Sequence, residues 1–385
     1  MRAWLLPEYI EDILPPVALR VERLRREMLD LFAVHGYELV MPPLLEYVDS
    51  LLTGTGHDLD LQTFKLVDQL SGRMLGLRAD IAPQVARIDA HLLNRTGVTR
   101  LCYAGSVLHT LPNGMSRTRE PLQIGAEIYG HGGIESDVEI QQLMMQALAV
   151  AAIEDVYLDI GHVGIFRDLV QRGRVDQGME SELFLAMQAK DVPAVRDLTR
   201  KLPAAFREGF AALPELYGGA EVLKEAARRL PAHPGIVSAL RDLKALSQRL
   251  ENVARVRCFD LAELRGYGYH SGVVFAAYAQ GQSYAIALGG RYDEVGKAFG
   301  RARPATGFSM DLRELAALSA APDDRSWVAA PYAPNDLALQ RRIAGLRRRG
   351  TPVVTELPGH AQAGGESPCD RRLVLRDGKW RLEKI

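Results

Sequence analysis

The stretch from residue 99 to residue 130 limits the possible folds of this chain more than any other part of the sequence. Arg100–His109 carries β-branched and aromatic residues, and Pro121–Tyr129 alternates apolar with polar positions, so we predict a strand in each. Thr110–Thr118, between them, contains a proline, an asparagine and a glycine, which favour a loop. We therefore predict two antiparallel strands joined by a loop well beyond the usual ~2–5 residues of a hairpin, and loops of that kind are often functional.

Gln123 and Glu127 lie four residues apart on the second predicted strand, so they point to the same face of it. An amide and a carboxylate on one face could hold an ammonium and an imidazole. They could equally belong to a solvated face, and their spacing leaves both interpretations open.

The composition is typical of a soluble globular protein, with 385 residues of which 47% are hydrophobic and 25% charged. This length suggests two or three domains. The net charge of −1 gives no global attraction to nucleic acid or to an anionic membrane. Three widely spaced cysteines fit a reducing cytosol rather than a zinc or disulfide scaffold, and the longest apolar run is shorter than a membrane span. We expect a cytoplasmic protein with no membrane segment, metal or cofactor.

The first predicted helix follows Pro15–Pro16 and stops at Gly36, with apolar residues at helical spacing: Val17, Val21, Leu24, Met28 and Leu31. A short strand, Tyr37–Pro43, comes next and is ended by two prolines. Leu75–Asp80 has the pattern of a strand end, and a further helix is predicted from Pro83 through Leu93. Asp80 then lies near the start of that helix, where it could serve the helix dipole or bind a ligand.

The character of the chain changes between about residues 166 and 252, where Leu, Ala, Arg and Glu dominate and prolines separate pieces of helical length. We interpret this region as a helical insertion between two strands of one sheet. The other elements predicted around it are a helix at Ser136–Ile153, strands at Val156–Ile160, Val256–Leu261, Gly272–Ala279 and Ser283–Leu288, a turn at Gly289–Asp293, and Ala305–Met310 leading into a helix through Leu318.

The last sixty residues have the pattern of a small α/β unit, with two strands, a helix at Asn335–Arg349, a glycine-rich loop at Gly359–Gly365 and a final strand pair around Leu373–Leu375 and Lys379–Leu382. Arg347–Arg349 is the only basic run. Because it ends the predicted helix, it is better explained by the helix dipole than by RNA binding.

Taken in order, these segments resemble the catalytic domain of class II aminoacyl-tRNA synthetases, and specifically the histidyl-tRNA synthetase family. Gly36–Pro43 with its preceding helix resembles motif 1, the dimer-forming element; the predicted hairpin resembles motif 2; and Gly307–Leu315 resembles motif 3. Arg265–His270 and Gly289–Asp293 resemble the two histidine-specific stretches of the family, the second without change.

The resemblance covers about residues 8 to 318 and implies an α+β fold, an antiparallel sheet flanked by helices. The expected domains are residues 1–320, a synthetase-like core that contains the insertion at about 166–252, and residues 321–385, the small C-terminal α/β domain.

The positions that hold ATP in this family are changed. The motif 2 arginine for the α-phosphate falls on His109 and a nearby glutamate on Leu111, whereas the motif 3 arginine for the γ-phosphate falls on Glu314 and its glycine on Asp311. Loss of one preorganised donor costs about 10²–10³ in rate, and a carboxylate beside a triphosphate adds repulsion. The resemblance therefore implies a chain that does not activate amino acids with ATP.

The family's pocket for histidine is better kept. Gln123, Glu127, Arg265 and Tyr269 match its pattern, whereas Asp80 replaces a glutamate and His270 replaces a tyrosine. The resemblance implies that a bound histidine would place its ammonium against Asp80 and Glu127 and its carboxylate against Arg265.

The regulatory subunits of ATP phosphoribosyltransferase are a branch of synthetase-like proteins with this combination and a shortened C-terminus. Similarity to that branch implies a catalytically inactive homodimer, formed through motif 1, that joins a short-form catalytic subunit in histidine biosynthesis, enables its activity and conveys feedback inhibition by histidine. It implies no tRNA binding. The alternatives are a histidyl-tRNA synthetase or other histidine-activating enzyme, and a histidine sensor for a different partner.

Overall fold

The computed structural model describes residues 4–54, 57–112, 118–253, 256–319, 326–359 and 369–385. The chain divides into two compact units, residues 1–320 and residues 321–385, and each is described by itself. In the described residues no helix is both long enough and apolar enough to cross a membrane.

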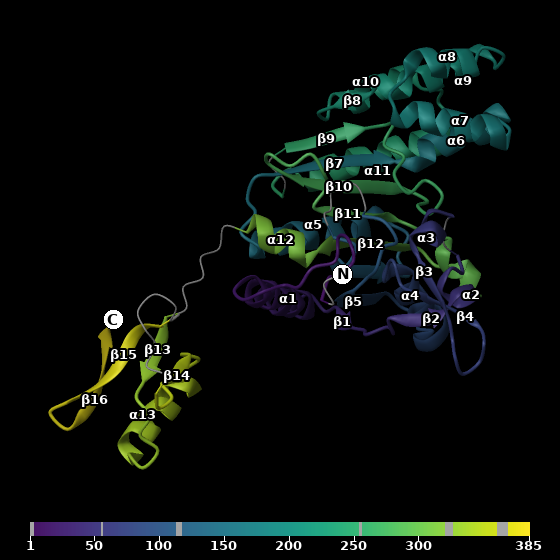
Figure 1. Ribbon diagram of the computed structural model, residues 1–385. Helices are drawn as coiled ribbons and strands as arrows, with labels where there is room; N and C mark the ends of the chain where they lie inside the picture. Colours follow the sequence, from purple (N-terminus) through teal and green to yellow (C-terminus); the bar gives the residue numbers. More distant parts are fainter. Residues whose placement is uncertain (1–3, 55–56, 113–117, 254–255, 320–325, 360–368) are drawn as a thin grey trace. The chain divides into compact units, whose positions relative to one another are not determined.

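A nine-stranded sheet forms the centre of the first unit (Figure 1). Most neighbouring strands are antiparallel, but the pairs β1–β5 and β7–β9 are parallel. In spatial order the strands are β1 (Glu38–Leu39), β5 (Thr99–Ser106), β6 (Leu122–Tyr129), β12 (Ala305–Asp311), β11 (Ala287–Arg291), β10 (Val273–Ala279), β7 (Val156–His162), β9 (Val256–Asp260) and β8 (Tyr217–Gly218). The fold class predicted from the sequence, a synthetase-like α+β sheet flanked by helices, is confirmed.

The predicted hairpin is present, because β5 and β6 pair antiparallel from Thr99 opposite Tyr129 to Ser106 opposite Leu122. The predicted alternation along β6 is also confirmed. Ile124, Ala126 and Ile128 lie in the large core under the helices, whereas Tyr129 belongs to a second cluster on the opposite face. The polar positions of β6 therefore share the face that does not carry the main helical layer. Residues 113–117 of the predicted loop lie outside the described residues.

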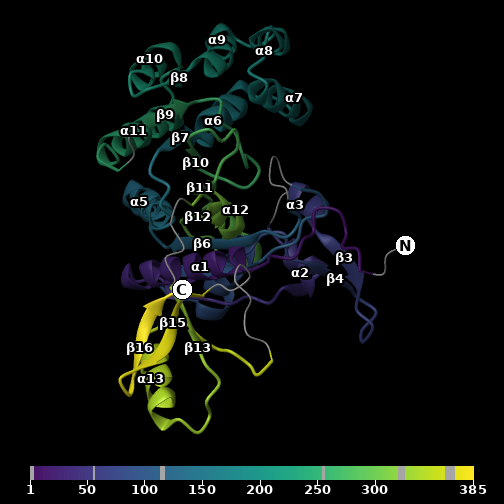
Figure 2. The same ribbon diagram turned by 60° about the vertical axis from the view of Figure 1, so that its left-hand side comes forward.

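Three helices cover the first face of the sheet: α1 (Val17–Val34), α5 (Ile134–Val150) and α12 (Leu312–Leu318). The stripe predicted for α1 is largely confirmed, since Val21, Leu24 and Met28 are buried in the core. Figure 2 shows α1 and α12 near β6. On the other face, α4 (Ala82–Arg87) continues as the π-helical turn η1 (Ile88–Leu93), which together span the helix predicted from Pro83 through Leu93.

One strand prediction is wrong. Ser283–Ile286 lies outside a strand, and β11 instead runs through Gly289 and Gly290, where a turn was expected. A Cβ on Gly289 would lie 2.4 Å from the carbonyl oxygen of Gly307 and 2.4 Å from the ring of Phe275. The glycines are therefore needed because neighbouring strands and side chains approach closely, and glycine within a strand often marks such an approach.

The region predicted as a helical insertion leaves the sheet after β7 and returns to it at β9. It consists of α6 (Val163–Gly173), α7 (Gln177–Gln188), α8 (Val192–Leu198), α9 (Ala204–Ala212), η2 (Leu213–Glu215), the short β8, α10 (Val222–Arg229) and α11 (Pro234–Arg249).

A small antiparallel sheet lies beside β1, in the order β2 (Leu45–Tyr47), β4 (Met74–Leu77) and β3 (Phe64–Val67). Short helices accompany it: α2 (Val48–Leu51), α3 (His57–Gln62) and the 3-10 helix η3 (Val295–Phe299).

The described residues of the second unit form one four-stranded sheet and one helix. The sheet order is β14 (Val353–Thr355), β13 (Trp327–Ala330), β15 (Cys369–Arg376) and β16 (Lys379–Lys384), and the helix is α13 (Leu337–Arg348). Leu339, Ile343 and Leu346 of α13 pack on the sheet. The strands and the helix predicted for this region are confirmed, whereas most of the predicted glycine-rich loop at 359–365 lies outside the described residues.

Candidate functional site

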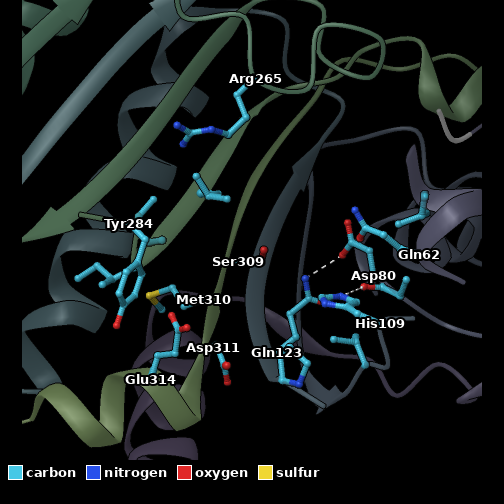
Figure 3. A pocket seen from close by; sticks show the side chains of 18 of the residues that line it. Gln62, Asp80, His109, Gln123, Arg265, Tyr284, Ser309, Met310, Asp311 and Glu314 are labelled. Atoms are coloured by element: carbon cyan, nitrogen blue, oxygen red, sulfur yellow. Dashed lines mark hydrogen bonds between the residues drawn. The ribbon is translucent and has the colours of Figure 1, made fainter. Parts of the chain in front are cut away.

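A cavity of about 500 Å³ opens beside β6, β12 and the first turn of α12. Asp80, Gln123 and His109 lie on one side of it, Arg265 and Tyr284 lie across from them, and Asp311 and Glu314 lie at the α12 end (Figure 3). Six of the ten residues predicted for the histidine and ATP sites therefore line one cavity. The loop before α4, strand β6, the segment after β9 and α12 each bring side chains to it.

Asp80 and Gln123 form a fixed polar pair. The Gln123 side-chain nitrogen donates to Asp80 Oδ1 at 2.8 Å, and Gln123 Oε1 accepts from the backbone N–H of Ile81 at 2.9 Å. Asp80 Oδ1 also accepts from the backbone N–H of Ala82 at the start of α4, at 3.1 Å. Asp80 thus serves the helix start and lines the cavity, so both interpretations of it are compatible with the geometry.

Arg265 approaches the cavity from the segment that follows β9. Its guanidinium donates to the Tyr278 hydroxyl at 3.0 Å and contacts the Glu263 carboxylate at 3.3 Å. The side chain is 42% exposed, so part of a permanently charged fork remains open to a ligand. Tyr278 and Glu263 were not singled out from the sequence, and only their contacts with Arg265 reveal that they position it.

Glu127 does not line the cavity. It is 1% exposed and accepts hydrogen bonds from the hydroxyls of Tyr103 at 3.0 Å and Tyr292 at 2.5 Å. Burial raises the pKa of Glu127 to about 8, although the two tyrosines act against this rise. At neutral pH, without a ligand, Glu127 is thus mainly a neutral carboxylic acid.

Tyr269 and His270 lie in the same layer as Glu127, outside the cavity lining. The Tyr269 ring packs against Tyr292, with 5.0 Å between centroids, and edge-on against His270 at 5.3 Å. Burial lowers the pKa of His270 to about 4, so its ring is neutral at pH 7. Within the described part of the chain, neither the Tyr269 hydroxyl nor His270 Nδ1 has a hydrogen-bond partner.

The four changed ATP positions do not form a phosphate-binding group. His109 is 8% exposed, and its Nε2 donates to the carbonyl oxygen of Ala79 at 2.9 Å. Leu111 is 71% exposed and does not line the cavity. Asp311 caps α12, because its Oδ1 accepts from the backbone N–H of Arg313 at 3.0 Å. Burial raises the pKa of Asp311 to about 6. Glu314 follows in the first turn of the helix and lines the cavity.

Two arginines near the α12 end of the cavity donate to backbone carbonyl oxygens and do not point into the cavity lining. Arg313 donates to the Glu120 carbonyl oxygen at 2.7 Å, and Arg119 donates to the His109 carbonyl oxygen at 3.1 Å. Neither lines the cavity. Among its described lining residues Arg265 is the only arginine or lysine, against the carboxyl groups Asp80, Asp311 and Glu314. This balance suits a small zwitterion at the Asp80–Arg265 end and disfavours a triphosphate at the α12 end.

Comparison with known proteins gives the same two-part division of the sequence. The family described as histidyl-tRNA synthetase matches residues 9–315, and the ATP phosphoribosyltransferase subunit HisZ C-terminal domain matches residues 325–383. The ATP phosphoribosyltransferase regulatory subunit of Nitrosospira multiformis is 56% identical over 386 residues, covering 99% of this chain and 98% of the relative. That of Ralstonia pickettii is 59% identical over 377 residues, covering 98% and 97%.

Solved structures show the same fold. An ATP phosphoribosyltransferase regulatory subunit/histidyl-tRNA synthetase from Bacillus halodurans superposes with a TM-score of 0.83 at 26% identity, covering 94% of this chain and 95% of that one. Histidyl-tRNA synthetase from Nostoc sp. PCC 7120 gives a TM-score of 0.78 at 17% identity over 99% and 94% of the two chains. Given both matched domains and relatives aligned over nearly the whole length, this chain belongs to the family of ATP phosphoribosyltransferase regulatory subunits.

Proposed function

We propose that this chain is a non-catalytic subunit of ATP phosphoribosyltransferase that binds histidine and a short catalytic subunit, enables the activity of that subunit and conveys feedback inhibition. One observation supports the proposal: Asp80, Gln123 and Arg265 line a single cavity, together with carboxylates and a buried imidazole at positions that the resemblance aligns with the ATP-binding residues of a synthetase. Such a cavity can bind an amino acid but lacks the groups that would activate it.

Histidine is the proposed ligand. Its carboxylate would bind the open part of the Arg265 guanidinium, and its ammonium would bind Asp80, which Gln123 already orients. Glu127 lies behind these groups and would hold its proton until a cationic group of the ligand came close enough to favour the carboxylate.

Absence of amino-acid activation is the second part of the proposal. A triphosphate at the α12 end would meet Asp311 and Glu314, and the Nε2 of His109 is already engaged with the Ala79 carbonyl oxygen. We propose that the chain neither adenylates histidine nor charges tRNA. The alternative of a histidyl-tRNA synthetase is also not favoured by the names of the relatives.

We further propose a homodimer through motif 1. The segment from β1 to β2 exposes a cluster of apolar side chains, with Met41 83% exposed and Leu39 52% exposed. Leu44 and Leu45, each 40% exposed, continue this surface. Contiguous exposed apolar side chains of this kind mark interaction surfaces.

The catalytic partner is proposed from the family and from a neighbour of the same fold. That neighbour, an ATP phosphoribosyl transferase (HisG:HisZ) complex from Thermotoga maritima, has a TM-score of 0.59 and 17% identity over 78% of this chain. Regulation would operate by linkage, in which the synthetase-like dimer stabilises an active arrangement of the catalytic subunit and histidine shifts that equilibrium. We propose a cytoplasmic location, with which the wide spacing of the chain's three cysteines is consistent.

The test is to mix the purified chain with the short catalytic subunit and measure phosphoribosyl transfer with and without histidine. We expect activation by this chain and inhibition by histidine only in the mixture. A catalytic subunit that is fully active and inhibitable alone would contradict the proposal. Histidine-dependent exchange of pyrophosphate into ATP by this chain alone would instead support the synthetase alternative.

A further inference from the structure

A second cavity lies in the helical insertion and shares no lining residue with the first. It has a volume of about 650 Å³ and lies between α10 and α11, which Figure 2 shows one above the other in the helical layer. We call it the α10–α11 groove. Its apolar floor includes Leu223, Leu230 and Ile236, which are buried.

The edge of the groove is apolar but exposed to solvent. Val237 is 53% exposed, and the small side chains of Ala220, Ala227 and Ala232 leave the floor accessible. Along α11, lining residues recur every three or four positions from Val237 through Leu240 and Lys244 to Gln248, which places them on one stripe. At 1.5 Å per residue this stripe is roughly 17 Å long, the length of about three helical turns.

The charged residues that line the groove are all cations: Lys224, Arg241 and Lys244. Arg241 approaches Asp242 at 3.7 Å and donates to the Ser238 hydroxyl at 2.9 Å. No ion pair involves Lys224 or Lys244 within the described ranges of the chain. A partner that forms ion pairs with both ammonium groups must therefore present carboxylates on both sides of its own apolar stripe.

We propose that the α10–α11 groove docks an acidic amphipathic helix of the catalytic subunit, about three turns long, with its apolar stripe on Val237 and Leu240 and its carboxylates facing Lys224 and Lys244. Helix-in-groove recognition uses apolar positions at this spacing for affinity and flanking charges for orientation. The inference rests on the proposed function and adds the surface that carries the partner.

The surface proposed for the homodimer points to the same division of roles. That surface lies on β1, β2 and the segment between them, whereas the groove is built from α10, α11 and the segments around α10. Pairing of two copies of this chain through motif 1 would therefore use none of the residues that line the groove, which stays open for a different chain.

Charge reversal at the two lysines of the groove tests whether they bind the catalytic subunit. Lys224→Glu/Lys244→Glu should raise the dissociation constant of the complex with the catalytic subunit at least about tenfold and reduce activation at limiting concentration. Lys201→Glu, at an exposed lysine of the insertion outside the groove, should change the dissociation constant less than about twofold. Unchanged thermal unfolding and unchanged histidine affinity of the isolated variants would show that the fold and the first cavity are intact.

A photoreactive benzophenone side chain introduced at Val237 identifies the occupant in the reconstituted complex. We expect a crosslink to a catalytic-subunit segment with apolar residues at helical spacing and flanking Asp or Glu. A crosslink to a second copy of this chain, or none in a complex that is otherwise active, would overturn the inference while leaving the proposed function intact. If the wild-type chain neither binds nor activates the catalytic subunit, the proposed function itself fails.

Discussion

The two ends of the first cavity differ in what their polar side chains are bonded to. At one end Gln123 orients Asp80, and Tyr278 with Glu263 orients Arg265, so paired charged groups are held toward the cavity. At the α12 end Asp311 accepts from the backbone N–H of Arg313, and His109, on the Asp80 side of the cavity, donates to the carbonyl oxygen of Ala79. One cavity therefore presents oriented polar groups at the Asp80–Arg265 end and a helix-capping carboxylate at the α12 end.

The buried residues behind the Asp80–Arg265 end of the cavity strengthen this contrast. Glu127 accepts hydrogen bonds from two tyrosines, whereas Asp311 caps α12 and Glu314 lies in the first turn of that helix. In the proposed function the cavity has lost amino-acid activation at one end and keeps recognition at the other, because each end is supported by different elements. The predictions that follow test each end separately.

Gly307→Ala should give the largest effect. A Cβ on Gly307 would lie 1.5 Å from Glu127 Oε2 and 2.8 Å from the carbonyl oxygen of Ala126, so the strand or the carboxylate must move. We expect a loss of about 3 kcal/mol in the free energy of unfolding, measured by chemical denaturation. Gly97→Ala is the control, because a Cβ there meets nothing within 4 Å, and it should change stability by less than about 0.5 kcal/mol. Equal effects of the two variants would show that the buried layer tolerates movement.

Arg265→Ala should raise the dissociation constant for histidine by about 10–100-fold, as expected for loss of a charge-assisted hydrogen bond to a carboxylate. Isothermal titration calorimetry measures this directly. Glu314→Gln, at the other end of the same cavity, should change it less than about twofold. If the two substitutions weaken histidine binding equally, the two ends do not have separate roles.

Much of this fold could be predicted from sequence patterns, because most of its helices and strands follow from local residue spacing. The alternation along β6 correctly placed Gln123 and Glu127 on one face, and the resemblance correctly brought Asp80 and Arg265 to the same cavity. Spacing could not show that Gln123 reaches the cavity while Glu127 is sealed, because the sealing residue, Tyr292, lies 165 positions further along the chain.

The wrong prediction around Gly289 has a similar cause. Glycines usually signal a turn, but here they lie within a strand whose neighbours come too close for a side chain. The positioning roles of Tyr278 and Glu263 also depend on tertiary contacts alone. Local pattern therefore predicts which face a residue occupies, whereas its burial and its partners come from distant parts of the chain.

The pH dependence of stability tests the buried layer more finely. The pKa of Glu127 is raised from 4.5 to about 8 in the folded chain, so between these values the folded state holds a proton that the unfolded state has released. Its contribution is greatest below pH 4.5 and is lost as the pH rises to 8. Glu127→Gln mimics the protonated form, so the variant should match the wild type near pH 4 and exceed it by on the order of 2 kcal/mol near pH 6. Denaturant titrations at both pH values measure this, and a difference that does not vary with pH would show that Glu127 is ionised throughout.

Asp311→Asn should give the smallest effect and tests the α12 end. The pKa of Asp311 is raised from 3.8 to about 6 by burial, so the cost of its ionisation grows as the pH rises from 3.8 to 6 and then stays constant. Asparagine keeps the cap on α12 without that cost but loses the stronger charged hydrogen bond, and the two changes oppose each other. We expect less than about 1 kcal/mol at pH 7.5, with the variant gaining on the wild type between pH 4 and pH 6. Asp176→Asn, at the exposed cap of α7, separates loss of a charged cap from relief of burial. If Asp311→Asn also leaves histidine affinity unchanged, the carboxylate at the α12 end serves the helix and not the ligand.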